Sequence, residues 1–199
     1  MIRHIVQYLS IVTGVLILIS GCSDSSSDPD LGGDLGQVSL TVSGDVQGEK
    51  TGMADFYGQD LGSLHYWELS FNDFSPQTYS LQLSLQDFEE IERPAPGSYE
   101  IGFNSPNPFG ESGPPVFTAI YTHIPNGSFT DAVEYSSGIL CGDDRTQWGT
   151  LVISSSTSSE VSGSFTFFAI DIDIDNSGNC VILGEIEVAG EFSARARQF

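Results

Sequence analysis

Apolar and polar residues alternate along most of this chain. In the segment 79–85 every second residue is apolar, and His65, Trp67, Leu69 and Phe71 occupy alternate positions of another segment. Successive side chains of a β-strand point to opposite faces of its sheet, so a period of two predicts half-buried strands. No long stretch has the 3.6-residue period of an amphipathic helix.

Similar segments follow one another, separated by turn-forming clusters such as 94–97, 125–127 and 176–179. Roughly nine to eleven short strands at this spacing predict an all-β fold, an antiparallel β-sandwich. A closed lipocalin-like β-barrel is the alternative. Residues 38–199 are long enough to bury a core as one domain. The expected strands cover 39–43, 64–71, 79–85, 98–103, 116–123, 129–135, 148–154, 161–174 and 180–194.

The first 22 residues have the order of a bacterial export signal. A basic pair precedes an apolar run at 5–19, which ends in Ile19-Ser20-Gly21-Cys22. This ending resembles the lipobox of bacterial lipoproteins, and the resemblance implies cleavage before Cys22 and acylation of its sulfur and of its new amine. We therefore expect residues 1–21 to be a signal peptide. The alternative, an uncleaved membrane helix, fits less well because such a helix needs about 20 apolar residues.

Residues 22–37 form the expected link between the lipid and the domain. They are rich in Ser, Asp and Gly and have little to bury, so we expect a disordered tether. Ser23 follows the cysteine, whereas in lipoproteins of enteric-type bacteria an Asp at that place favours retention in the inner membrane. The resemblance therefore implies a lipid-anchored protein of the cell envelope, most simply at the outer membrane.

The chain is strongly acidic, with a formal net charge of −21. Removal of residues 1–21 takes away one arginine and no acid, so the net charge becomes −22 and Lys50 is the only lysine. Nucleic acids and anionic lipid surfaces both require clustered positive charge, so we expect neither as a partner. Self-repulsion that keeps the protein soluble is the simplest explanation, and binding of divalent cations is the alternative.

Two cysteines, Cys141 and Cys180, remain once Cys22 carries lipid. An even pair in an oxidising compartment predicts a disulfide. Closing a loop of about 40 residues would stabilise the domain by roughly 4 kcal/mol. Two reduced, buried thiols are the alternative.

Asp171, Asp173 and Asp175 alternate with isoleucines and lead into a turn at 176–179. Ca²⁺ binds six to eight oxygen atoms, and alternating carboxylates before a Gly-containing turn can supply several of them. The simpler interpretation is that the three carboxylates share the solvated face of a strand. We therefore expect no cofactor, with Ca²⁺ as the alternative.

Other candidate residues carry less information. His65 and His123 lie on predicted strands and are expected to be packed residues rather than metal ligands. Phe109 lies in a long irregular stretch, 104–115, which is a candidate contact loop. No Gly-x-Ser-x-Gly, Ser-x-x-Lys or His-Glu-x-x-His motif occurs, so we expect no catalytic residue.

Residues 160–169 and 188–194 have the pattern of a closing hairpin. It is similar to the Gly-x-Phe-x-Phe hairpins of uncharacterised secreted β-rich lipoproteins, which implies a fold and a location but no activity. We therefore expect an envelope-anchored lipoprotein with a non-enzymatic binding or structural role, whose partner is an envelope protein or a polysaccharide. The alternatives are a Ca²⁺-dependent adhesion module and a hydrolase of envelope or extracellular polymers.

Overall fold

The computed structural model describes residues 36–74, 76–89, 91–103, 114–141, 145 and 147–197. All of them belong to one unit, Leu31–Phe199. The signal peptide at 1–21, the lipidation site Cys22, most of the tether at 22–37 and the candidate contact residue Phe109 lie outside the described residues. The expectations for these segments stay predictions.

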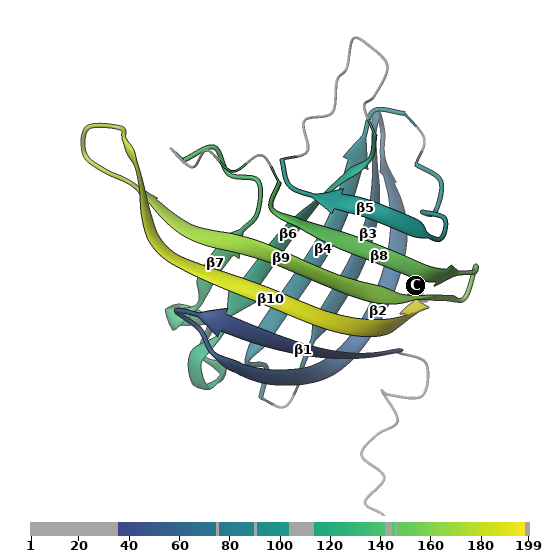
Figure 1. Ribbon diagram of the computed structural model, residues 1–199, viewed down its shortest axis with the longest axis horizontal. Helices are drawn as coiled ribbons and strands as arrows, with labels where there is room; N and C mark the ends of the chain where they lie inside the picture. Colours follow the sequence, from purple (N-terminus) through teal and green to yellow (C-terminus); the bar gives the residue numbers. More distant parts are fainter. Residues whose placement is uncertain are drawn as a thin grey trace, which may run out of the picture. The chain divides into compact units, whose positions relative to one another are not determined.

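Strands make up most of the described part of the chain, which confirms the all-β prediction (Figure 1). None of its helices is long and apolar enough to span a membrane. The elements in chain order are β1 (Gly36–Gly44), β2 (Gly48–Leu61), β3 (Leu64–Asn72), β4 (Tyr79–Asp87), β5 (Gly97–Ile101), β6 (Val116–His123), the 3₁₀ turns η1 (Pro125–Gly127) and η2 (Phe129–Asp131), β7 (Val133–Ser136), β8 (Gly149–Ser156), β9 (Glu160–Ile174) and β10 (Cys180–Ala196).

All ten strands belong to one sheet, whose pairings lead back to their starting point. From β2 the neighbours are β3, β4, β6, β5, β8, β9 and β10, and β10 then pairs with β1 and β2, which also pair with each other. The expected sheets were antiparallel, but the observed sheet is mixed, because β5 pairs with β6 and β10 with β2 in parallel over two residues each. The sheet curls so that β9 and β10 cross in front of β3 and β4 (Figure 1).

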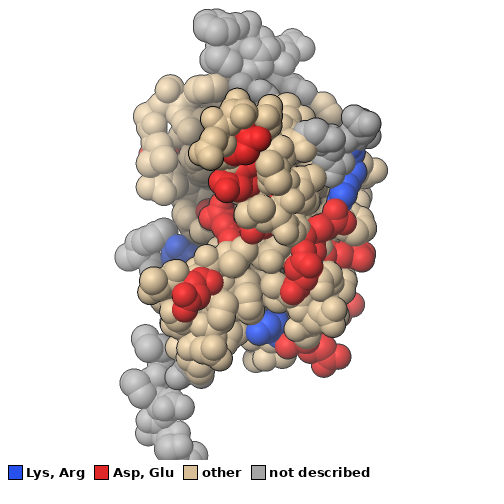
Figure 2. All heavy atoms as spheres, turned by 90° about the vertical axis from the view of Figure 1, so that its left-hand side faces the viewer, with Lys and Arg blue, Asp and Glu red and all other residues tan. Residues whose placement is uncertain are grey.

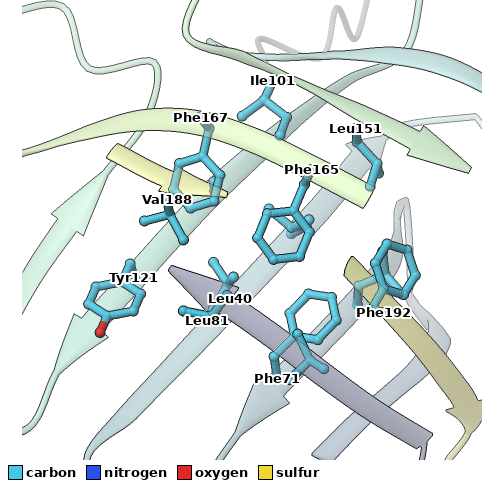
Figure 3. Close-up of a cluster of buried hydrophobic side chains, with 14 of the residues drawn as sticks. Leu40, Phe71, Leu81, Ile101, Tyr121, Leu151, Phe165, Phe167, Val188 and Phe192 are labelled. Atoms are coloured by element: carbon cyan, nitrogen blue, oxygen red, sulfur yellow. The ribbon is translucent and has the colours of Figure 1, made fainter. Parts of the chain in front are cut away.

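The curled sheet encloses one main core (Figure 3). The ring of Phe71 on β3 lies 5.5 Å from that of Phe165 on β9 and 5.4 Å from that of Phe192 on β10, measured between centroids. Strands far apart in the sequence therefore pack on each other across the interior. Burying each such side chain stabilises the fold by about 1.5–3 kcal/mol.

The Gly-x-Phe motifs of β9 and β10 pair with each other in a reciprocal way. Gly163 of β9 is opposite Phe192 of β10, and Phe165 of β9 is opposite Gly190 of β10. A Cβ atom on Gly190 would lie 2.8 Å from the end of the Phe165 ring, so the ring fills the space over the glycine. Such aromatic cover compensates for a glycine in a strand and fixes the register of the hairpin.

Two segments differ from the prediction. The alternation does not reveal β2, because its inward positions include Lys50, Gly52 and Ala54 instead of large apolar residues. The strand expected at 129–135 begins only at Val133, since residues 129–131 form the turn η2. The neighbours β1 and β3 impose the strand conformation of β2, which local hydrophobicity does not signal. Residues 129–131 lie beyond the end of β6, the partner of β7, whose pairing starts at His123 and Val133.

Candidate functional site

The strands β9 and β10 continue beyond the rest of the sheet as a two-stranded projection, which we call the hairpin extension (residues 171–184; Figure 1). Its last residue pairs join Ile172 to Ile182, Asp173 to Val181 and Ile174 to Cys180. A β-bulge between Ile182 and Gly184 bends β10 at the base of the extension.

The two faces of the hairpin extension differ in character. Paired residues point to the same face, so Ile172, Ile174 and Ile182 share one face, while Asp171, Asp173 and Val181 share the other. Large apolar side chains are exposed on both faces of the hairpin extension and at Leu140, next to Cys141. The exposed aliphatic group consists of Leu140 (74%), Ile174 (58%), Val181 (42%), Ile182 (43%) and Leu183 (61%).

A small second core holds the base of the hairpin extension. It consists of Cys141, Trp148 and Ile170, with partly buried hydrophobic residues around it. Cys141 and Cys180 form the predicted disulfide, which is thereby confirmed, and it joins this core to the first residue of β10. The isoleucine face of the extension is therefore continuous with a buried core at one end and exposed at the other.

Arg145 adds a polar brace to the same region. Its guanidinium lies 5.1 Å from the ring centroid of Trp148 and 5.2 Å from that of Phe168. One of its terminal nitrogens donates to Glu185 at 2.7 Å. Cation–π contacts of this kind contribute about 0.5–1 kcal/mol each at partly exposed sites.

The three aspartates of the alternative Ca²⁺ site differ in their surroundings. Asp175 belongs to the turn, where its carboxylate accepts hydrogen bonds from the backbone of Ser177 and from the backbone and side chain of Asn179. The side-chain bond from Asn179 is the main reason that the pKa of Asp175 is lowered. Among the described residues, no group of three or more His, Cys, Asp or Glu side chains is placed to hold a metal ion.

Asp171 lies nearer the main core than the other two aspartates. Burial, and then the charge of Asp173, raise its pKa above the ordinary range. Burial, and then the charges of Asp171 and Asp45, raise the pKa of Tyr135. Acidic side chains thus gather where the hairpin extension leaves the sheet, and Figure 2 shows that acids outnumber basic residues on this face.

The two described histidines lie far apart. His65 pairs with Asp87 at one end of β4, and its Nδ1 lies 2.6 Å from a carboxylate oxygen of Asp60. His123 pairs with Tyr79 at the other end of β4. The pKa of His123 is lowered by burial and by the charge of Lys50. They do not share a site.

One cluster of charged residues is absent from the sequence prediction. Asp55 on β2 accepts hydrogen bonds from the side chain of Arg197 at 2.9 and 2.6 Å, and the same arginine lies 4.4 Å from the ring centroid of Tyr57. Tyr57 also hydrogen-bonds Glu68, whose pKa is raised mainly by burial. This cluster fastens the end of β10 to β2. No local motif signals it, because Asp55 and Arg197 are 142 residues apart.

A broad hollow of about 960 Å³ covers the outer face of β1, β2, β8, β9 and β10. Its lining is rich in glycine and in short hydroxyl side chains, so the hollow follows from the small size of many of these residues on a curled sheet. Its polar members are Gln37, Ser39, Thr51, Ser154, Ser162, Ser164, Glu191 and Ser193.

These features define a class: an all-β domain with a single mixed sheet and a disulfide-held projecting hairpin. No family model, curated protein or solved structure matches the chain.

Proposed function

We propose that this domain is a non-enzymatic binding module, held at the outside of a bacterial membrane by lipid on Cys22, and that the hairpin extension is its contact surface. The observation that carries the proposal is the exposed aliphatic group. Single exposed apolar residues are common on proteins, but several of them on one projecting element are typical of an interaction surface. Leu140 adjoins one half-cystine and Val181 the other, so the disulfide keeps the group together.

The base of the hairpin extension supports the same proposal. The disulfide, the small core around Trp148 and the brace from Arg145 restrict the projection before any partner arrives. A contact surface that is ordered in advance loses less conformational entropy on binding. The hairpin extension therefore suits a binding role better than the sheet's hydroxyl-lined hollow does.

The test places a photo-crosslinking residue at Leu183 in cells that make the protein. Leu61, which is 54% exposed at the turn between β2 and β3, is the matched control position. We expect a discrete adduct from position 183 and none from position 61. The same adducts from both positions, or none from position 183, would contradict a contact surface at the hairpin extension.

The lipid anchor has a test of its own. Mass spectrometry of the purified protein should show a chain that begins at Cys22 and carries fatty acids, as the lipobox resemblance implies. Replacing Cys22 by Ser should release the protein from membranes. A membrane-bound chain that keeps its first 21 residues and carries no fatty acid would remove this part of the proposal.

Ca²⁺ dependence is a second candidate, because Asp171 and Asp173 lie on the same face of β9, and the charge of Asp173 adds to burial in raising the pKa of Asp171. A cation near the two carboxylates would relieve their repulsion. Thermal unfolding in EDTA, then in CaCl₂, with NaCl of equal ionic strength as the control, tests this candidate. A Ca²⁺ site requires a higher Tm in CaCl₂ than in NaCl. The hydrolase alternative stays a prediction that no specific observation favours.

A further inference from the structure

The charged side chains of the hairpin extension and its base are all acidic. Residues 171–187 contain five acids and no Lys, Arg or His. These acids are Asp171, Asp173, Asp175, Glu185 and Glu187. Arg145 forms an ion pair with Glu185, so one of the five charges is balanced. A partner of the hairpin extension therefore meets an excess of negative charge.

One face of the hairpin extension combines this charge with an apolar side chain. Asp173 lies directly opposite Val181, and directly opposed side chains of two paired strands have Cβ atoms about 4.5–5.5 Å apart. Asp173 is exposed, and one of its oxygens accepts the backbone N–H of Ile174 at 2.8 Å, which orients the carboxylate. An exposed carboxylate and an exposed aliphatic side chain therefore lie side by side on this face.

The other face is apolar next to the disulfide. Ile174 lies opposite Cys180, and Leu140 precedes Cys141 in the chain. The Cα atoms of the two bonded cysteines are 5.4 Å apart, so both exposed aliphatic residues adjoin the disulfide. Removing such side chains from water is favourable only against another apolar surface. The isoleucine face therefore requires an apolar neighbour.

Charge and apolar surface together select one class of partner. A second copy of this chain would bring its own net charge of −21 against the same sign of charge. Nucleic acids and anionic lipids are also negatively charged. A neutral polysaccharide offers hydroxyl groups but no apolar side chains for the isoleucine face. A protein surface with both apolar and basic side chains matches both faces, and charge complementarity of this kind favours the right partner over others.

We propose that the hairpin extension inserts into a cleft of a partner protein, with an apolar wall against Ile174 and Ile182 and Lys or Arg side chains opposite Asp173. A cleft is required because exposed aliphatic residues lie on both faces of the projection. Their burial supplies affinity, and the basic side chains fix the orientation. The inference rests on the proposed function and names the chemistry of its partner.

The test of the basic side chains uses the full-length protein in cells, with p-benzoylphenylalanine at position 183. Asp173→Lys should lower the yield of the adduct at least about tenfold, because opposed like charges strongly disfavour an interface. The matched control is Glu191→Lys, which changes the net charge by the same amount. Glu191 is an exposed acid about 30 Å further along β10, so this variant should leave the yield unchanged.

The test of the apolar wall uses the same crosslinking position. Ile174→Ser should lower the yield about tenfold, because one buried aliphatic side chain is lost from the interface. Leu61→Ser is the matched control, since Leu61 is 54% exposed and Ile174 58%, and it should have no effect. The Tm of each purified variant shows whether it is folded, and Ile182→Ser replaces Ile174→Ser if that variant is unstable.

The outcomes separate this inference from the proposed function. A protein adduct that is lost in Asp173→Lys and in Ile174→Ser, and kept in both controls, supports the inference. An adduct that mass spectrometry assigns to lipid, to polysaccharide or to another copy of this chain would overturn it and leave the contact surface standing. So would an adduct that either variant leaves unchanged, or one that Glu191→Lys weakens equally. No adduct from position 183 would contradict the proposed function and the inference with it.

Discussion

Two buried tyrosines lack hydrogen-bond partners at one end of the main core. Tyr79 and Tyr121 are fully buried with stacked rings, and neither hydroxyl has a partner among the described residues. The Tyr121 hydroxyl points away from the apolar cluster (Figure 3). A buried polar group without a partner keeps its full desolvation cost.

Replacing Tyr121 by Phe should therefore raise the free energy of unfolding, by up to about 1 kcal/mol. Tyr99→Phe is the matched control, and it should lower stability, because the Tyr99 hydroxyl donates to the carbonyl of Ala95 at 2.7 Å. Urea unfolding measures both. A loss of stability in Tyr121→Phe would instead indicate an ordered water bound to the hydroxyl.

The same tyrosine makes stability depend on pH on the alkaline side. Burial raises the pKa of Tyr121 in the folded state, so the unfolded chain loses this proton first. The stabilisation that comes from keeping Tyr121 neutral in the folded state is complete below about pH 10, which is the pKa of tyrosine in the unfolded chain. Stability should fall as the pH rises above 10, and less steeply in Tyr121→Phe.

Glu68 gives the corresponding prediction on the acidic side. Burial raises its pKa in the folded state, so the stabilising contribution of its proton is complete below the unfolded pKa and is lost as the pH rises through the folded pKa. At pH 7, Glu68→Gln should be more stable than the original protein, with a smaller difference at pH 4. Glu49→Gln, at an exposed position of β2, should show no such trend in urea unfolding.

At the scale of single residues, a bond was predictable where a simple rule on residue type and number applies. Cys141 and Cys180 follow from parity and compartment, and the structure confirms their bond. The fastening of Arg197 to Asp55 was not predictable, because it depends on β10 returning to β2. Hydrogen bonds between distant segments leave no trace in local composition.

The hairpin extension is the element whose stability depends most on one bond. The disulfide closes a loop with a sequence separation of 39 residues, so removing it should cost about 4 kcal/mol by chain entropy. In Cys141→Ser/Cys180→Ser, hydrogen exchange should accelerate at 171–174 and 180–184 and stay slow in β3 and β4. Unchanged exchange in the extension would show that the small core holds it without the disulfide.

Strand prediction succeeded where one face of a strand is apolar. β3 and β4 have large buried residues at every second position, such as Trp67, Leu69 and Leu81. β2 does not, because Gly52 on its inner face lies against the Tyr79 hydroxyl, where a larger side chain would not fit. The Tyr79 side chain thus fills space that Gly52 leaves open. A hydrophobic pattern does not show that a position must be small.

Charge acts on the molecule as a whole. The structure places Arg145, Arg195 and Arg197 in ion pairs with acids, which leaves a large excess of negative charge on the surface. Raising NaCl from low concentration to 1 M shortens the screening length to about 3 Å. The Tm should therefore rise with salt.

The double variant Glu49→Gln/Glu187→Gln removes two exposed acids and should show a smaller rise in Tm with NaCl. Sucrose, which carries no charge, separates screening from general exclusion of solutes. A Tm that does not depend on salt would mean that the excess charge is too widely spaced to affect folding.

The net charge of the molecule can be counted from the sequence, but the order in which the strands pair could not be predicted. Alternation shows that strands exist but not which strands are neighbours.

β10 is the last strand and a neighbour of β1, β2 and β9 at once. Until it has been synthesised, β9 lacks its longest partner, and the Gly-x-Phe motifs cannot interlock. The last pairings of this sheet therefore form only after β10 has been made, and a chain that still lacks β10 exposes the edges of β1 and β9.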